Sequence, residues 1–83
     1  MLLSEQIRAA RMLLNWNQDA LAENAEVGIS TVKRMEARNG PVTGHAESVW
    51  KIQAALEKAG VVFISGDVTG GPGVRLAAPY EKP

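Results

Sequence analysis

The residues whose types and spacing most clearly suit a binding function lie in one short segment near the middle of the chain. Lys33 and Arg34 stand side by side, and helical spacing places them on one face with Ile29, Ser30 and Ala37. Such a face suits the edges of DNA bases in the major groove: an arginine pairs with guanine, a hydroxyl donates or accepts, and isoleucine covers a thymine methyl. An ordinary solvated helix face is the alternative interpretation.

Two short helices should precede this segment in the chain. The first is expected to begin at Ser4, a good N-cap residue, and to end at Asn15. The second should run from Gln18 to about Asn24, with Asn17 as its N-cap. Apolar residues at helical spacing define the buried stripe of the first helix: Leu3, Ile7, Ala10 and Leu14.

The candidate segment itself should form a third helix, followed by a fourth. The third runs from about Ile29 to Ala37, with Val32 and Met35 inward, and the turn-forming run 39–41 ends it. The fourth should run from about Gly44 to Lys58, with Gly60 as its C-terminal cap. Its inward residues are predicted to be Val49, Ile52, Leu56 and Ala59.

The hydrophobic period changes after the fourth helix. Residues 61–64 are β-branched or aromatic, glycine-rich turns follow, and residues 74–76 alternate as a second short strand. We therefore expect a β-hairpin or an extended arm at 60–76, after a helical domain at 1–59. Residues 77–83 have little apolar content and should form a flexible tail.

Length and composition exclude several classes of protein. A chain of 83 residues has room for one domain. It contains no cysteine and a single histidine, His45, so it holds neither a disulfide framework nor a thiolate metal site. No apolar run approaches the ~20 residues that span a bilayer. With no signal peptide apparent, we expect a cytoplasmic protein.

The sequence offers little from which to build a catalytic site. The run 71–73 is glycine-rich but lacks the Lys-Ser/Thr and following helix that a phosphate-binding loop requires. His45 and Glu47 have no second histidine or clustered carboxylate with which to perform acid-base chemistry. We therefore expect no enzyme and no cofactor.

The charge of the whole chain is neutral, with nine basic and nine acidic residues. Neutrality does not support nucleic-acid binding, which usually leaves a basic excess. The distribution is uneven, however, because Lys33, Arg34 and Arg38 lie within one short segment. One face of the protein should therefore be locally positive, although three acidic residues precede it: Asp19, Glu23 and Glu26.

The segments read together resemble the Cro/C1-type (XRE) helix-turn-helix family. The resemblance rests on the run 16–22, on Val27, and on the runs 30–32 and 35–36, and it covers about residues 6–56. It implies a mainly α, four-helix, lambda-repressor-like helix-turn-helix domain that binds a double-stranded DNA operator. A transcriptional repressor that acts as a homodimer is the simplest function of that kind.

The resemblance also assigns roles to individual residues. Positions matching Asn17 and Gln18 usually meet a DNA phosphate, which agrees with the free amides of a helix N-terminus. Arg11 and Glu36 match an ion pair that ties the first helix to the third, although two unrelated surface charges are the alternative. Adding Arg38 from its charge, the DNA-binding set is Asn17, Gln18, Gly28, Ile29, Ser30, Lys33, Arg34 and Arg38.

Three departures from the family pattern favour weaker DNA binding. Glu26 stands where the turn usually has glycine, Gly28 replaces the usual Ser or Thr cap, and the loop 39–44 has no Lys or Arg. An exposed, apolar Ile29 would also favour the binding of a protein. The alternative function is therefore an antiactivator or antitoxin-like module on the same fold, which binds a protein such as a transcriptional activator.

The C-terminal segment resembles the tail of short bacterial XRE-like regulators. A two-stranded hairpin has open edges and is marginal by itself, so pairing with a second subunit would stabilise it. A symmetric dimer would place two recognition helices roughly 34 Å apart. A hairpin that only closes the core of a monomer is the alternative. Trp50 is expected in the core or at a dimer surface, and the dimerisation residues would be Val62, Phe63, Ile64, Val74 and Leu76.

Overall fold

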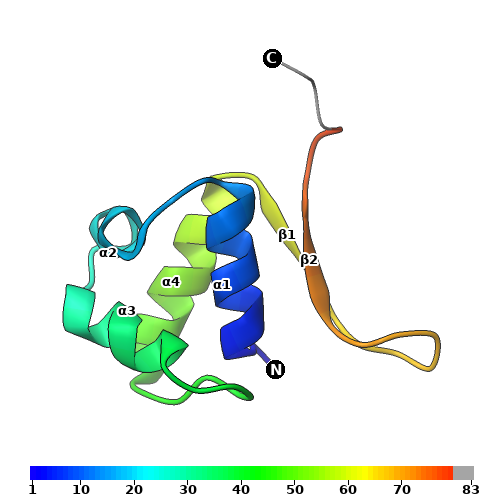
Figure 1. Cartoon of the computed structure of the whole chain (residues 1–83), viewed down its shortest axis with the longest axis horizontal. Helices are drawn as coiled ribbons and strands as arrows, with labels where there is room; N and C mark the ends of the chain where they lie inside the picture. The colour runs from blue at the N-terminus through cyan, green and yellow to red at the C-terminus, as the bar shows by residue number, and fades with distance from the viewer. Residues whose placement is uncertain (80–83) are drawn as a thin grey trace.

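The computed structural model describes residues 1–79, which form four helices followed by a two-stranded antiparallel hairpin (Figure 1). The prediction of a mainly helical domain with a C-terminal hairpin is confirmed at this level. Of the expected tail, residues 80–83 lie outside the described part of the chain. The elements are α1 (Ser4–Leu13), α2 (Gln18–Ala25), α3 (Ile29–Glu36), α4 (Ala46–Lys58), β1 (Val61–Ile64) and β2 (Gly73–Leu76).

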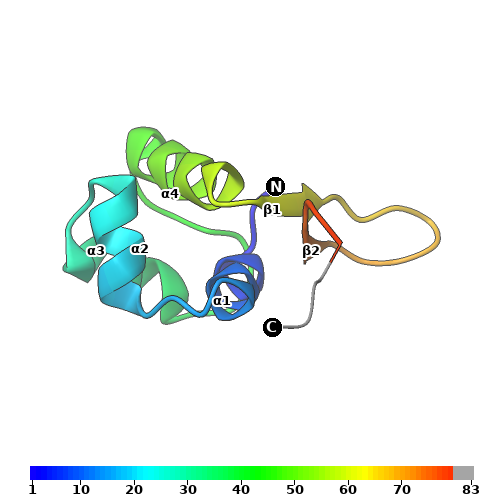
Figure 2. The same cartoon turned by 90° about the horizontal axis from the view of Figure 1, so that it is seen from above.

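The helices pack around one apolar core, and the hairpin stands at the side of α1 and α4, away from α3 (Figures 1 and 2). Every helix contributes to the core, because each helix has an apolar stripe to remove from water. Within residues 1–79, no helix is long and apolar enough to cross a membrane. The largest fully buried side chains are Ile7, Leu21, Val32, Ile52 and Leu56.

The prediction that Ser4 caps α1 is wrong. Leu3 is the N-cap, in an extended conformation, and Ser4 is the first helical residue. The hydroxyl of Ser4 donates instead to the carbonyl oxygen of Met35, at 2.6 Å, in a buried position. A tertiary hydrogen bond therefore takes the group that the local pattern assigned to the helix end. The open backbone amide of Leu3 is bound by the side-chain oxygen of Gln6 at 2.8 Å.

The fourth helix begins two residues later than predicted and buries a narrower stripe. Gly44 has φ of +131°, which is incompatible with a helix, so His45 becomes the N-cap of α4. At the other end Ala59 is exposed, contrary to the prediction, because it is the C-cap residue after the last helical turn. Ile52 and Leu56 are fully buried as predicted.

The turn between α2 and α3 holds a non-glycine residue in the left-handed conformation. Glu26 adopts the left-handed conformation, with φ 57° and ψ 45°, and its amide closes α2 by donating to Ala22 and Glu23. Glycine would adopt this conformation without the steric cost of a Cβ atom. The family pattern leaves two outcomes for Glu26, an unfavourable backbone conformation or a different turn, and the structure has the first.

The hairpin places its side chains on two faces. The register pairs Val61 with Leu76 and Phe63 with Val74 on one face. That face meets the helices, because Val61 is buried and both Phe63 and Val74 pack against the core. The other face carries Val62, Ile64 and Arg75.

Gln6 fastens the hairpin to α1. Its side-chain amide donates to the carbonyl oxygen of Gly73 at 3.0 Å and to that of Ile64 at 3.4 Å. These two carbonyls belong to the last residue of β1 and the first residue of β2, which pair at the loop end of the hairpin. Gln6 is 5% exposed, so its polar groups depend on these partners rather than on water.

Candidate nucleic-acid interface

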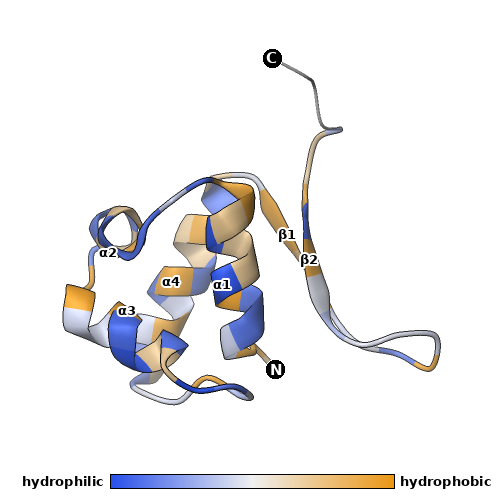
Figure 3. Cartoon of the chain, in the orientation of Figure 1, coloured by the Kyte–Doolittle hydropathy of each residue, from blue (hydrophilic) through white to orange (hydrophobic). Residues whose placement is uncertain are grey.

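The exposed face of α3 carries the polar and basic residues that the sequence assigned to it. Ser30, Lys33 and Arg34 are exposed, whereas Val32 and Met35 on the opposite side are buried. Figure 3 shows this division as alternating hydrophilic and hydrophobic segments along α3. The helix therefore offers a polar surface on a rigid, core-packed element.

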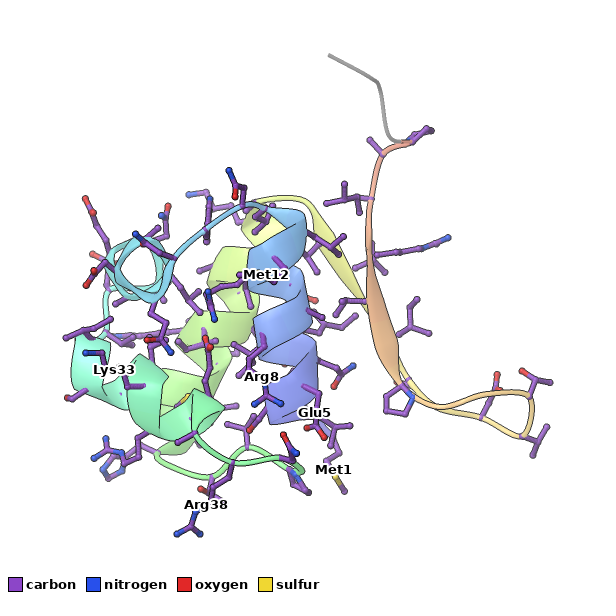
Figure 4. All side chains as sticks on the ribbon, viewed as in Figure 1. Met1, Glu5, Arg8, Met12, Lys33 and Arg38 are labelled. Atoms are coloured by element: carbon purple, nitrogen blue, oxygen red, sulfur yellow. The ribbon has the colours of Figure 1, made fainter. Side chains whose placement is uncertain are left out.

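Three basic side chains on and just after α3 have no partner within residues 1–79. Lys33, Arg34 and Arg38 are exposed, and no hydrogen bond or ion pair in that part of the chain occupies their side chains. Figure 4 shows Lys33 on α3 and Arg38 projecting away from the body of the protein. Their charges are available to an external anion.

Ile29 does not have the exposure that the sequence analysis gave it. It is half-buried at the first position of α3 and packs against the core. Part of its side chain therefore lies against the core and only the rest faces solvent. The argument for a protein-binding surface from an exposed Ile29 is wrong for the same reason.

The N-terminus of α3 lacks a side-chain cap, as predicted from Gly28. Gly28 is the N-cap, and its carbonyl oxygen accepts the first amides of the helix, from Thr31 and Val32. A Cβ atom at this position would meet only the Ser30 Oγ, at 3.7 Å. The structure therefore has room for a Ser or Thr here, and the missing cap is a feature of the sequence rather than of the geometry.

The two residues expected at a phosphate are differently placed. Asn17 is exposed and caps α2, because its Oδ1 accepts the amide of Ala20 at 2.8 Å. Gln18 is half-buried, and its Nε2 donates to the Glu36 carboxylate at 3.3 Å. The side chain of Gln18 is thus engaged inside the protein, while its backbone amide remains at the start of α2.

Arg11 and Glu36 form a bidentate ion pair between α1 and α3. The Arg11 Nη2 lies 2.6 Å from one carboxylate oxygen and its Nε lies 2.8 Å from the other. The side chains of Arg11 and Glu36 are only 12% and 3% exposed. Arg11 also donates to the carbonyl oxygen of Trp16 at 3.1 Å. The pair has the geometry of a buried structural contact, in which each partner depends on the other.

Two further residues of α1 hold the C-terminal end of α3. Ser4 binds the Met35 carbonyl oxygen, and Arg8 Nη1 donates to the Glu36 carbonyl oxygen at 2.8 Å. Arg8 also reaches the side chain of Asn39 at 2.6 Å. Because the last carbonyls of a helix have no partner within the helix, these contacts satisfy the end of α3 and fix its direction. The sequence analysis missed Ser4 and Arg8 in this role, although residues 4, 8 and 11 share one face of α1.

The first turn of α1 and the residue Leu2 before it hold the loop that follows α3. The amide of Ser4 donates to Gly40, the amide of Val42 donates to Leu2, and the amide of Gly40 donates to the Glu5 carboxylate. This hydrogen bond from Gly40 holds the pKa of Glu5 below its usual value. The loop 39–44 is thereby fixed beside the end of α3.

A hollow of about 380 Å³ adjoins the basic face. It lies between α3 and the N-terminus of α4, and Arg34 forms part of its wall. The open amides of a helix N-terminus, a guanidinium and several hydroxyls together suit an oxyanion such as a phosphate. The sequence analysis missed this hollow, although the N-cap position of α4 was a usable signal. Its polar lining is Thr31, Arg34, Thr43, His45 and Ser48.

No protein-family model matches this chain, and a search of curated proteins found no match.

Proposed function

We propose that the protein is a sequence-specific DNA-binding regulator of the Cro/C1-like, lambda-repressor-like kind, with α3 as its recognition helix. The observation that carries this proposal is the set of exposed basic residues on and just after α3: Lys33, Arg34 and Arg38. Residues of α1 hold the C-terminal end of this helix in place. A rigid helix with an exposed, basic face is what insertion into a major groove requires.

The residues of this surface divide into base-reading and phosphate-binding groups. Ser30, in the first turn of α3, and Arg34, in its second half, are exposed and would read base edges, with Arg34 pairing with guanine. Lys33 and Arg38 supply positive charge for the flanking phosphates. The start of α2, at Asn17 and Gln18, and the hollow beside Arg34 offer backbone amides to the same backbone.

Regulation by occlusion follows if the site overlaps a promoter. A homodimer would read a palindromic operator with half-sites one helical turn apart, roughly 34 Å. The bound dimer then excludes polymerase from the same DNA, as a cytoplasmic repressor does. No catalytic group and no cofactor takes part.

The deciding experiment is a gel shift on the upstream region of its own gene, with Arg34→Ala and a matched control. The control is Arg75→Ala, which removes an exposed arginine from the hairpin, on the side away from α3. We expect Arg34→Ala to cost about 1–3 kcal/mol at one base position. Arg75→Ala should leave affinity unchanged. Equal losses for both variants on every duplex would refute base reading by Arg34.

A second function on the same fold is an antiactivator or antitoxin-like module that binds a protein. Two observations favour it: the Gln18 side chain is bound to Glu36, and the loop 39–44 carries no basic residue. Each absent phosphate contact reduces affinity and flattens its dependence on salt. In the gel shift, no binding at micromolar protein by the folded chain would select this second function.

A further inference from the structure

The outer face of α4 carries the largest exposed aromatic side chain in the described chain. Trp50 is 68% exposed, which excludes it from the core position considered in the sequence analysis. Beside it lies a hollow of about 270 Å³ between α4 and the end of α2, with Ala54 and Ala55 in its wall. A large indole next to small residues is a shape to which another helix can dock closely.

The charges on this face balance. Glu47 and Lys51 form an exposed pair at 3.5 Å, and Glu57 and Lys58 are exposed one turn and more beyond. A face with two acids and two bases is not suited to nucleic acid or to an anionic membrane. It suits a surface that carries the same acidic and basic residues in the reverse order, so that opposite charges face each other.

The hairpin offers less than the sequence analysis expected for self-association. Of its five candidate residues, Phe63 and Val74 are already packed against the core of their own chain. Only Val62 and Ile64 of β1 belong to the outer face, where Arg75 of β2 is the cross-strand partner of Val62. This patch is small beside the ~800 Å² per partner of a standard interface.

We propose that a second copy of this chain docks on α4, with the two helices antiparallel and the two-fold axis near Ala54. In this arrangement each Trp50 lies at the level of the Lys58 of the other copy, because both are four residues from the axis. Its indole can then rest on the aliphatic part of that lysine. Glu47 of one copy lies within a turn of Lys58 of the other, so opposite charges meet at both ends.

The hollow at the far end of α4 provides the space that this docking requires. It measures about 350 Å³, and its wall includes Lys58 and Ala59, which lie four and five residues past Ala54, where the indole of the other copy would arrive. Lys58 and Ala55 belong to both hollows, so one groove continues along α4. The residues lining the far hollow are Trp16, Asn24, Ala55, Lys58 and Ala59.

Cysteine cross-linking tests the position of the axis directly, because the chain has no natural cysteine. In Ala54→Cys, the two cysteines would lie beside the two-fold axis. Their Cα atoms would then fall within the separation of about 4.4–6.8 Å that a disulfide needs. Val62→Cys, on the outer face of the hairpin, is the matched control. We expect oxidation to join Ala54→Cys into disulfide-linked dimers and to leave Val62→Cys without a disulfide link. The opposite result would overturn the proposal in favour of the hairpin.

Sedimentation of the unmodified chain and of Trp50→Ala, without DNA, gives an independent measurement. We expect the unmodified chain to be a concentration-dependent dimer, and Trp50→Ala to weaken association at least tenfold while its circular dichroism stays that of the folded chain. Lys58→Glu should weaken association, and Glu47→Lys added to it should restore it.

A chain that stays monomeric at all concentrations, or a Trp50→Ala that associates as well as the unmodified chain, would overturn the proposal. Capture of a different protein by the Trp50 face of a monomeric chain would do the same. DNA binding is not needed for any of these measurements, so a negative gel shift with intact dimers would refute the proposed function alone.

Discussion

Removal of Arg11 should destabilise the protein far more than removal of a surface charge. In Arg11→Met, the Glu36 carboxylate keeps only the 3.3 Å contact from Gln18, at a site where its side chain is 3% exposed. Breaking a buried pair by removing one partner costs about 3–5 kcal/mol, whereas an exposed pair is worth ~0–1 kcal/mol. At about 0.05–0.15 kcal/mol per residue, that is a large share of the total stability of a domain this size.

The assay is urea unfolding followed by circular dichroism, with the double variant Arg11→Met, Glu36→Leu as control. The double variant replaces both charges by apolar side chains of similar size, and it should be more stable than Arg11→Met alone. The melting temperature should fall by about 12 °C or more in the single variant, at 4–8 °C per kcal/mol. A loss below about 1 kcal/mol, or a double variant less stable than the single one, would show that the pair is not buried in solution.

Three further predictions follow from the fold. Gln6→Leu leaves the carbonyl oxygens of Gly73 and Ile64 without their donor, so hydrogen exchange in the hairpin should speed up and stability should fall by about 1–3 kcal/mol; unchanged exchange would contradict the contact. Glu26→Gly should raise stability, by up to about 1 kcal/mol, because Glu26 is left-handed; a loss in urea unfolding would contradict this. The Asp67 carboxylate accepts hydrogen bonds from Thr69 and Gly70, and these bonds lower its pKa. The ionised carboxylate therefore stabilises the hairpin loop above the pKa of the unfolded chain, and this stabilisation is lost as the pH falls below about 4. In Asp67→Asn, the change in the amide chemical shifts of the loop at acid pH should be absent.

The parts of the fold that the sequence predicts are those that depend on neighbouring residues. The Asn17 cap and the missing cap at Gly28 each follow from residue type and position within a few residues, whereas the left-handed Glu26 could be anticipated only through the family pattern. The element types follow from hydrophobic period, which is a local property of the chain. The predicted start of α4 failed because Gly44 takes a conformation set by the loop rather than by helix propensity.

The contacts that fix the candidate site are long-range and could not be predicted in this way. Ser4 reaches a residue 31 positions away, and Gln6 reaches residues 58 and 67 positions away. Ser4 satisfies the local pattern of a helix cap equally well, so its tertiary role is invisible without coordinates. Arg11 and Glu36 were paired only through the family resemblance, since their spacing of 25 has no local meaning.

The neutral charge of the chain is a weaker objection to nucleic-acid binding once the location of each basic residue is considered. Arg8 and Arg11 are occupied by α3 and its carboxylate, so they act as structural groups. Among the other basic residues, Lys33 and Arg34 lie on the exposed face of α3, and Arg38 lies two residues past the end of that helix. The two phosphate contacts proposed for each copy, from Lys33 and Arg38, would give a salt slope of about −1.8, and a dimer about twice that. The slope would therefore measure how many copies bind, and it would connect the α3 surface to the proposed dimer on α4.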